Sequence, residues 1–371
     1  MSTVGLGMPS VAKGLRTQAG PAVSETAPAA PTSGPLVDTY GRVARDLRVS
    51  LTDRCNLRCT YCMPAEGLDW MPSSAVLTTS ELQRLIRIAV TLLGVREIRF
   101  TGGEPLLYAR ITELVAATAA LEPRPEISLT TNALGLQRKA AALKAAGLDR
   151  VNVSLDTVNA RNFHTLTRRD RLADVLQGLA AASEAGLTPV KVNAVLQPGI
   201  NDLDAPELLQ FCLDHGYELR FIEQMPLDAE HGWRRDRFVT AEQILASLAR
   251  KFTLTPHSEH RGSAPAERFW VDGGPATVGI IASVTRPFCG DCDRTRLTAD
   301  GQIRSCLFSH GETDLRALLR GDSCDQVADG AEGDAVLAQA WRAAMWRKLP
   351  GHGINDPGFL QPHRSMSAIG G

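Results

Sequence analysis

Short apolar and β-branched runs alternate along this chain with longer stretches rich in Ala, Leu and Glu. The short runs predict buried β-strands, and they lie at 47–52, 96–100, 126–131, 150–155, 189–195 and 218–223. The longer stretches predict helices, and they lie near 79–93, 110–121, 134–146, 170–185 and 204–215. A Thr-Thr-Ser-Glu run gives the first helix a capped start, and Gly147 and Gly186 stand where helices are expected to end.

Six repeats of strand and helix predict parallel βα units, whose functional groups gather at the carboxyl ends of the strands. Because a closed barrel of this type needs eight units, we expect a partial, open α/β barrel. The remainder of the chain, about 230–371, has a less regular pattern and is the candidate to cover the gap. The Gly- and Pro-rich stretch 262–275 is predicted to form loops within it.

The first 36 residues differ in composition from the rest. They are rich in Gly and Pro and hold almost no large apolar side chains, so they bury too little surface to offset the entropy of ordering. We therefore expect a disordered tail at 1–36, a barrel at 37–230, a second domain at 231–360 and a C-terminal tail at 361–371.

Composition restricts the classes of partner. Hydrophobic residues make up 44% and charged residues 22% of the chain, and the net charge is −1. This charge gives no global attraction to nucleic acid or to an anionic membrane, so an anionic substrate must meet a local basic cluster. The chain has no apolar run near 18 residues and no apolar signal core within 1–36. We therefore expect neither a membrane span nor export, and predict a cytoplasmic protein.

Six of the eight cysteines fall in two clusters, which favours metal binding over disulfides. Cys212 and Cys324 stand alone and are expected to carry no chemistry. In the first cluster, Cys55, Cys59 and Cys62 follow the strand at 47–52 with the spacing CxxxCxxC. Three thiolates can hold three irons of a [4Fe–4S] cluster and leave the fourth iron open.

An open iron can chelate the amino and carboxylate groups of S-adenosylmethionine, and an electron from the cluster then releases a 5′-deoxyadenosyl radical. Zinc is the alternative, but structural zinc normally takes four ligands. The run Thr-Gly-Gly-Glu-Pro at 101–105 supports the first interpretation. Its glycines let the backbone approach a ligand closely, and Glu104 can accept hydrogen bonds from an ammonium group.

Cys289, Cys292 and Cys306 form a second set of three thiols. Taken alone, this set is compatible with a zinc site that has His310 as its fourth ligand. Beside a radical cluster it favours a second [4Fe–4S] cluster, whose open iron can bind a substrate heteroatom.

Two arginines lie between these cysteines. Arg294 and Arg296 flank a hydroxyl residue and could hold a polyphosphate with bidentate hydrogen bonds. The neighbouring Asp291 and Asp293 argue against a nonspecific basic patch.

Together the motifs resemble the GTP 3′,8-cyclase family of molybdenum cofactor biosynthesis, within the radical S-adenosylmethionine superfamily. The resemblance extends from about Val43 to the last residue and rests on matching motifs in the same order. They are 46–64, 98–105, 130–132, 153–156, 220–223, the Cys-x-x-Cys-x-Arg-x-Arg element and the terminal Gly-Gly. Asn132-Ala133 departs from a common Asn-Gly. The resemblance implies an incomplete (β/α)6 TIM-like barrel, closed by a C-terminal domain that carries the second cluster.

The resemblance also implies roles for individual residues. Those matching contacts to S-adenosylmethionine are Tyr61, Gly103, Ser154 and Met225. Those matching contacts to GTP are Arg48, Arg99, Thr130, Lys191, Arg294, Thr295 and Arg296. Those matching catalytic groups are Arg48, Arg294, Arg296, Gly370 and Gly371, the last two as a tail that enters the active site. Because Arg48, Arg99 and Lys191 lie in three predicted strands, where buried charge needs a partner, they also favour a polyanion independently.

The implied reaction removes the hydrogen from carbon 3′ of the GTP ribose and joins that carbon to carbon 8 of guanine. Its implied cofactors are two [4Fe–4S] clusters and S-adenosylmethionine. Its implied partners are a flavodoxin- or ferredoxin-type electron donor and a downstream cyclic pyranopterin monophosphate synthase, and a homodimer is compatible with the family. Two alternatives stay open here: a radical enzyme acting on a peptide or another nucleotide, and a zinc-stabilised binding protein without catalysis.

Overall fold

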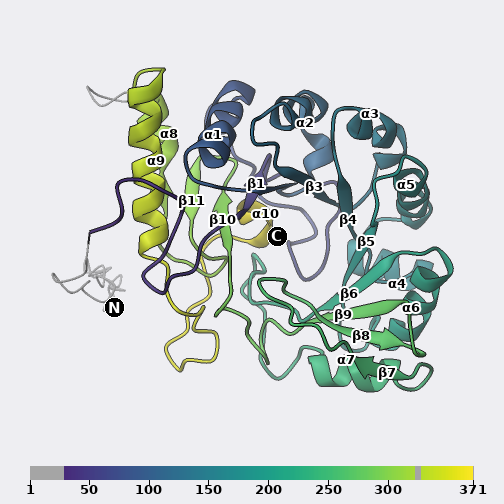
Figure 1. Ribbon diagram of the computed structural model, residues 1–371. Helices are drawn as coiled ribbons and strands as arrows, with labels where there is room; N and C mark the ends of the chain where they lie inside the picture. Colours follow the sequence, from purple (N-terminus) through teal and green to yellow (C-terminus); the bar gives the residue numbers. More distant parts are fainter. Residues whose placement is uncertain (1–28, 322–326, 371) are drawn as a thin grey trace, which may run out of the picture. The chain divides into compact units, whose positions relative to one another are not determined.

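Figure 1 shows the sheet around which the chain is built. The computed structural model describes residues 29–321 and 327–370, and the chain from Pro31 onward forms one compact unit. Six parallel strands follow one another in the sheet, which confirms the six predicted strands. They are β1 (Asp46–Ser50), β2 (Glu97–Thr101), β3 (Glu126–Thr131), β4 (Arg150–Ser154), β5 (Lys191–Val195) and β6 (Glu218–Ile222).

The connecting helices are also present, with one addition. The predicted helices are α1 (Thr79–Thr91), α2 (Ile111–Ala119), α3 (Ala140–Ala145), α5 (Leu172–Glu184) and α6 (Ala205–Asp214). Thr78 caps α1 through a reciprocal bond pair with Glu81, and positive φ angles at Gly147 and Gly186 follow the ends of α3 and α5. The sequence did not predict α4 (Ala160–Thr167), which is only eight residues long.

The two faces of the six strands differ in polarity. One face packs under the helices and is fully apolar, with Leu47, Val49, Ile98, Phe100, Ile127, Leu129, Val151, Val153, Val192, Ala194, Leu219 and Phe221 at most 1% exposed. The other face carries Arg48, Arg99, Thr130, Asn152, Asn193 and Arg220. Because side chains alternate along a strand, the burial of the first set turns the second set toward the concave side.

The C-terminal part does not build a sheet of its own. It adds β9 (Thr277–Ile281) in parallel beside β6, and β10 (Arg294–Leu297) in parallel beside β1. Antiparallel strands continue outward from these two. They are β7 (Leu254–Pro256), β8 (Glu267–Val271), β11 (Gln302–Arg304) and β12 (Thr313–Asp314). The expected cover over the gap is therefore an extension of the sheet at both edges, and the described strands form one mixed twelve-stranded sheet.

The remaining helices belong to this C-terminal part. They are α7 (Ala241–Leu248), α8 (Leu315–Arg320), α9 (Ala331–Trp346) and the short α10 (Met366–Ile369). In Figure 1, α9 runs beside α8 at one side of the sheet, whereas α10 lies near its middle. None of the described helices has the length and apolar character needed to cross a bilayer.

Three local predictions need correction. The helix predicted at 134–146 is a 3-10 turn, Leu136–Arg138, followed by the shorter α3, because Gly135 has a left-handed φ of 88°. The stretch 262–275 contains strand β8 besides loops. Leu36, inside the predicted disordered tail, is fully buried and its N–H donates to the Leu93 carbonyl at 3.1 Å. Residues 1–28 of that tail lie outside the described residues.

Candidate active site

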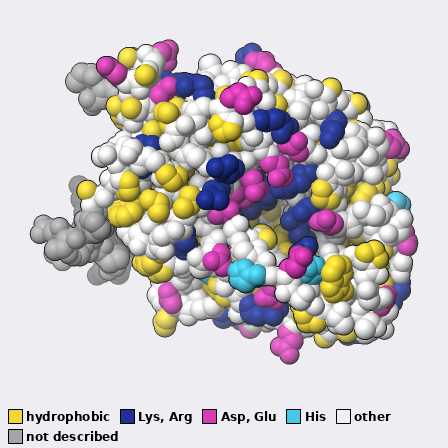
Figure 2. Space-filling model, viewed as in Figure 1, with side chains coloured by type: hydrophobic (Ala, Val, Ile, Leu, Met, Phe, Trp, Pro, Cys, Tyr) yellow, Lys and Arg dark blue, Asp and Glu magenta, His cyan; other side chains and the backbone are white. Residues whose placement is uncertain are grey.

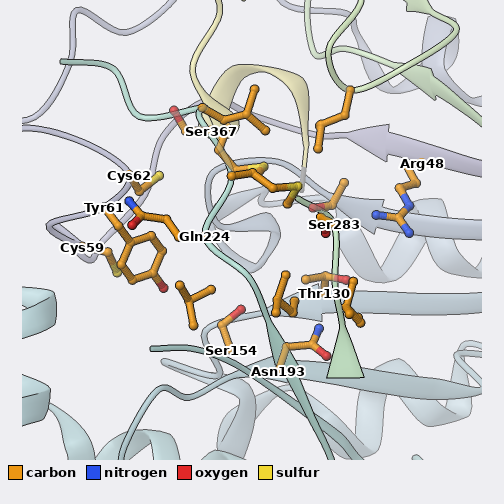
Figure 3. A pocket seen from close by; sticks show the side chains of 18 of the residues that line it. Arg48, Cys59, Tyr61, Cys62, Thr130, Ser154, Asn193, Gln224, Ser283 and Ser367 are labelled. Atoms are coloured by element: carbon orange, nitrogen blue, oxygen red, sulfur yellow. The ribbon is translucent and has the colours of Figure 1, made fainter. Parts of the chain in front are cut away.

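The concave face of the sheet encloses a cavity of about 340 Å³, and both cysteine sets line it. In Figure 3, Cys59, Tyr61 and Cys62 lie at one end and Arg48 lies at the other. The surface in Figure 2 is hollowed near the middle of the view, where Lys and Arg side chains gather beside acidic ones. Two cysteine sets separated by more than 220 residues thus open into one space.

The first cysteine set lies on the loop that follows β1. Its thiols are Cys55, Cys59 and Cys62, all free and partly exposed. Burial raises the pKa of Cys55 to about 11 and that of Cys62 to about 12, so these thiols are protonated until a metal ion replaces the proton. The Tyr61 hydroxyl donates to Asp156 at 2.8 Å, which fixes the ring beside the cysteines.

The two glycines at 102–103 also have a packing role that the sequence did not predict. A Cβ at Gly102 would collide with the Thr52 carbonyl, and one at Gly103 would collide with the carbonyls of Asp53 and Arg54. The glycines therefore let this turn pack directly on the backbone that leads into the cysteine loop. Gly103 lines the cavity as well.

Glu104, in the same turn, is fully buried. Its carboxylate accepts from Leu106 N at 2.9 Å, Thr131 Oγ1 at 2.7 Å and Asn132 N at 2.7 Å. Burial outweighs these bonds and raises its pKa to about 7. In this structure Glu104 joins the ends of β2 and β3, which positions the cavity wall.

In the second cysteine set, Cys289 and Cys292 lie between β9 and β10, and Cys306 follows β11. Burial by itself would raise the pKa of Cys292, but the charges of Arg294 and Lys348 outweigh it and lower that pKa to about 6. Arg294 Nε lies 3.4 Å and Lys348 Nζ 3.3 Å from the Cys292 sulfur. The sulfur is therefore held as a thiolate at neutral pH.

Each set supplies three thiols, one fewer than the four donors that structural zinc normally takes. Zinc needs its donors around a single point, whereas the cysteines of a cubane bind different irons. Across the described part of the chain, no three His, Cys, Asp or Glu side chains converge on a point that could hold one metal ion. His310, the predicted fourth zinc ligand, is exposed, bonds to the Leu360 carbonyl and does not line the cavity. Cys212 is buried in the core, and Cys324 lies outside the described residues.

Arginines concentrate at the end of the cavity away from the first cysteine set. Strand pairing places Arg48 beside both Arg296 and Arg99 on three adjacent strands. Arg48 and Arg99 share one carboxylate, Asp46, at 3.8 Å each. Arg220, on β6, reaches Asn152 at 2.7 Å. This end carries more positive than negative charge, an arrangement that a polyanion would stabilise.

Electrostatics and unfilled hydrogen bonds agree with that interpretation. Burial and the neighbouring arginines hold the pKa of Arg48 well below its usual range and lower that of Arg220 to about 9. The buried atoms Arg48 Nε, Arg220 Nε and Asn193 Oδ1 have no hydrogen-bond partner within the described residues. Unpaired buried groups of this kind indicate a ligand site.

Most residues predicted for the site line the cavity. They are Arg48, Tyr61, Arg99, Gly103, Thr130, Ser154, Met225, Arg294, Arg296 and the six clustered cysteines. Three described residues do not, namely Lys191, Thr295 and Gly370. Thr295 faces the opposite side of β10, where its hydroxyl accepts from Trp341 Nε1 at 3.0 Å, and its contact with GTP stays a prediction. Lys191 lies at the amino end of β5 and pairs with Glu218 at 3.1 Å.

The C-terminal tail reaches the cavity wall. Gly370 is buried with a φ of 72°, and its carbonyl accepts a hydrogen bond from Arg296 Nη1. A Cβ at this position would collide with Ser50 Oγ. Gly371, predicted with it, lies outside the described residues.

Several polar residues of the site were not predicted. Arg220 and Asn193 line the cavity, and their alternation with apolar strand residues could have revealed them. Asp156, which holds Tyr61, ends a motif but resembles an ordinary loop acid. Lys348 carries no local sequence signal, because its role comes from a contact with residues more than 50 positions earlier.

Comparison with known proteins agrees with this geometry. Two family models match: the Radical SAM superfamily over residues 49–212 and Molybdenum Cofactor Synthesis C over residues 217–354. Proteins named GTP 3′,8-cyclase are similar over nearly the whole chain. One from Mycobacterium sp. (strain KMS) is 66% identical over 95% of this chain and 98% of its own length. One from Streptomyces coelicolor is 66% identical over 91% and 96%.

A further relative, GTP 3′,8-cyclase 2 of Mycobacterium tuberculosis, is 61% identical over 100% of both chains. Among solved structures, Streptococcus suis SuiB bound to S-adenosylmethionine is similar in fold, with a TM-score of 0.53. The match covers 79% of this chain and 68% of SuiB at 15% identity, so it bears on the fold alone.

Proposed function

The chain belongs to the GTP 3′,8-cyclase family of radical S-adenosylmethionine enzymes, and from this premise we propose how its cavity serves the reaction. It is a lyase of the first step of molybdenum cofactor biosynthesis. In this proposal Cys55, Cys59 and Cys62 hold a [4Fe–4S] cluster and S-adenosylmethionine at one end of the cavity. The second cysteine set holds another [4Fe–4S] cluster, and the arginines bind GTP between the two.

One observation carries this proposal: both thiol sets and the arginines line a single cavity. A radical made at one end must meet the ribose directly, since any other encounter would damage the protein. Enclosure and fixed geometry meet this requirement by holding the reacting atoms together and excluding solvent.

The triphosphate is proposed to bind at the arginine end. Arg48, Arg99, Arg294 and Arg296 can donate to phosphate oxygens, and we add Arg220 because its Nε is buried without a partner. Thr130 faces the same space. Lys191, which pairs with Glu218, and Thr295 are retained in the proposed set from the family resemblance, although neither lines the cavity.

At the opposite end, Tyr61, Gly103, Ser154 and Met225 are proposed to contact S-adenosylmethionine. The bond from Tyr61 to Asp156 fixes the ring of Tyr61 at the cavity wall. In the C-terminal tail, Gly370 is proposed to orient Arg296 toward the substrate through its carbonyl. The same role is proposed for Gly371.

When bound, the first cluster and S-adenosylmethionine supply the radical that takes a ribose hydrogen. The residues of the chain bind the triphosphate, keep the base near the second cysteine set and exclude water. No histidine or carboxylate of the cavity is assigned proton transfer. Glu104 and Asp156 already accept hydrogen bonds from the protein itself.

The decisive experiment is anaerobic incubation of the reconstituted chain with GTP, S-adenosylmethionine and dithionite, followed by mass analysis of the nucleotide. We expect about eight irons per chain, GTP-dependent 5′-deoxyadenosine, and (8S)-3′,8-cyclo-7,8-dihydroguanosine triphosphate. Two zinc ions and no 5′-deoxyadenosine would contradict the proposal.

Cysteine variants separate the two clusters. Cys55→Ser is expected to abolish cleavage of S-adenosylmethionine, whereas Cys292→Ser is expected to retain uncoupled cleavage without cyclised product. Wild-type product from either variant would refute the two-cluster arrangement.

The proposal includes further partners. A flavodoxin- or ferredoxin-type donor would reduce the first cluster, and a cyclic pyranopterin monophosphate synthase would consume the product. Free thiols at both sets are compatible with a reducing, cytoplasmic setting.

A further inference from the structure

Lys348, directly after helix α9, is a buried cation without a carboxylate partner. Lys348 is only 4% exposed. Its ammonium group lies 3.0 Å from the Cys292 carbonyl, 3.0 Å from the Arg294 carbonyl and 3.3 Å from the Cys292 sulfur. No ion pair between Lys348 and an acidic residue occurs in the described chain. Since a buried charge is costly unless paired, the sulfur of Cys292, which is a thiolate when it binds iron, is the group within reach that can compensate Lys348.

The ammonium group has three N–H donors, and its three contacts all lie on one short segment, 292–294. That segment leads from the second cysteine pair into strand β10. Lys348 therefore fixes the thiol of Cys292 and the backbone of Arg294 at the same time. A residue that served only to end α9 would not need to satisfy a sulfur atom.

The two cysteine sets differ in the donors that reach their sulfurs. The Cys292 sulfur accepts hydrogen bonds from the Lys348 ammonium group and from Arg294 Nε at 3.4 Å, so two cations lie beside one sulfur. At the first set, Cys55 is approached by the neutral amide of Asn132 at 3.8 Å. Hydrogen bonds to cluster sulfurs and nearby positive charge both favour the reduced, more negative form of an iron–sulfur cluster.

We propose that Lys348 is a positioning residue that holds the Cys292 thiolate and raises the reduction potential of the cluster bound by Cys289, Cys292 and Cys306. The inference rests on the proposed second cluster. The second cluster is then easier to reduce than it would be without this lysine. Lys348 touches neither substrate nor S-adenosylmethionine in this proposal.

The test uses the full chain with Cys55, Cys59 and Cys62 all changed to Ser, so that only the second cluster remains. In this background we compare Lys348→Met, Lys348→Arg and the matched control Arg347→Met, which removes an exposed charge one residue away. After anaerobic reconstitution, iron content is measured and the cluster is titrated by electron paramagnetic resonance. Binding of GTP is measured in parallel.

For Lys348→Met we expect the ratio of reduced to oxidised cluster at a fixed potential to fall about tenfold, which is about 59 mV for a one-electron couple. Lys348→Arg is expected to keep most of the wild-type potential, and Arg347→Met all of it. An unchanged potential in Lys348→Met at full iron content overturns the inference. If Lys348→Met loses iron and Lys348→Arg keeps it, the result supports the role of the positive charge. If both variants lose iron equally, Lys348 serves packing only, and the inference is overturned. Absence of iron in the unsubstituted background would instead overturn the second cluster itself, and with it the proposed function.

Discussion

Arg220→Met provides a test in which stability and substrate binding should change in opposite directions. Arg220 lies on the cavity face of β6, contacts Asn152 and is surrounded by Arg99 and Arg150. Burial and these neighbours lower its pKa from 12.5 to about 9. Methionine keeps most of the side-chain volume and removes the charge.

The magnitude follows from that pKa. Because a tenfold change in proton affinity is worth about 1.4 kcal/mol, holding this guanidinium charged costs the ligand-free fold of the order of 5 kcal/mol. Solvent around the half-buried side chain screens part of this cost, and the lost bond to Asn152 removes about 1 kcal/mol more. We therefore expect Arg220→Met to raise the free energy of unfolding by about 1–3 kcal/mol. A lowered cation pKa destabilises the fold at every pH below about 9, so the gain should be constant from pH 6 to 8.

Binding of GTP should respond in the opposite sense. A charge-assisted hydrogen bond to phosphate contributes about 1.5–3 kcal/mol, so the variant should bind GTP about 10- to 150-fold more weakly. Anaerobic calorimetry measures the affinity, and thermal unfolding at a fixed scan rate measures stability. Arg171→Met, an exposed arginine paired with Asp174, is the matched control and should change neither quantity. Wild-type affinity together with a loss of stability would refute the assignment of Arg220 to the substrate site.

Three further predictions test the cavity wall. Gly370→Ala should displace the tail, because the new Cβ would collide with Ser50 and the backbone φ of 72° disfavours alanine. We expect kcat to fall at least tenfold while 5′-deoxyadenosine still forms, and an unchanged kcat would show that the tail does not belong to the active site. Glu104, with a pKa raised to about 7, stabilises the fold below pH 4.5, and this contribution is lost as pH rises through 7. The free energy of unfolding should therefore fall between these pH values, and Glu104→Gln should lack this part of the decrease. Glu223 is fully buried and accepts hydrogen bonds from Ala241 N, Val284 N and both the N–H and the hydroxyl of Thr285. Glu223→Ala should therefore lower the free energy of unfolding, measured by denaturant titration, by about 3 kcal/mol. A loss below about 1 kcal/mol would contradict this account.

The six central strands could be predicted because their apolar residues face helices along their whole length. Strands β7–β12 could not, since several are only two to four residues long and β10 reads Arg-Thr-Arg-Leu, a charged pattern atypical of a buried strand. Sheet pairing with β1 overrides that local composition. Local propensity also missed α4, which begins at the cap formed by Asn159.

In the candidate site, too, some features could be predicted from the sequence and others could not. Closely spaced cysteines are a local signal, so both sets could be recognised from the sequence. Which side of β10 carries Thr295 depends on the register of that strand with β1, which the sequence does not encode locally. The contact of Lys348 with Cys292 joins segments 56 positions apart, and no local pattern encodes it.

The attachment of β9 and β10 to opposite edges of the central sheet also affects how the chain is made. A nascent polypeptide leaves the ribosome from its amino terminus, so β1 to β6 emerge while both outer strands are still unsynthesised. Until residue 281 has been added for β6, and residue 297 for β1, each of these strands presents a row of unsatisfied backbone groups, which can pair with other chains and promote aggregation. A polypeptide stopped after residue 230 would keep both edges open permanently. Chaperone dependence should therefore be greatest during translation of the last third of the message.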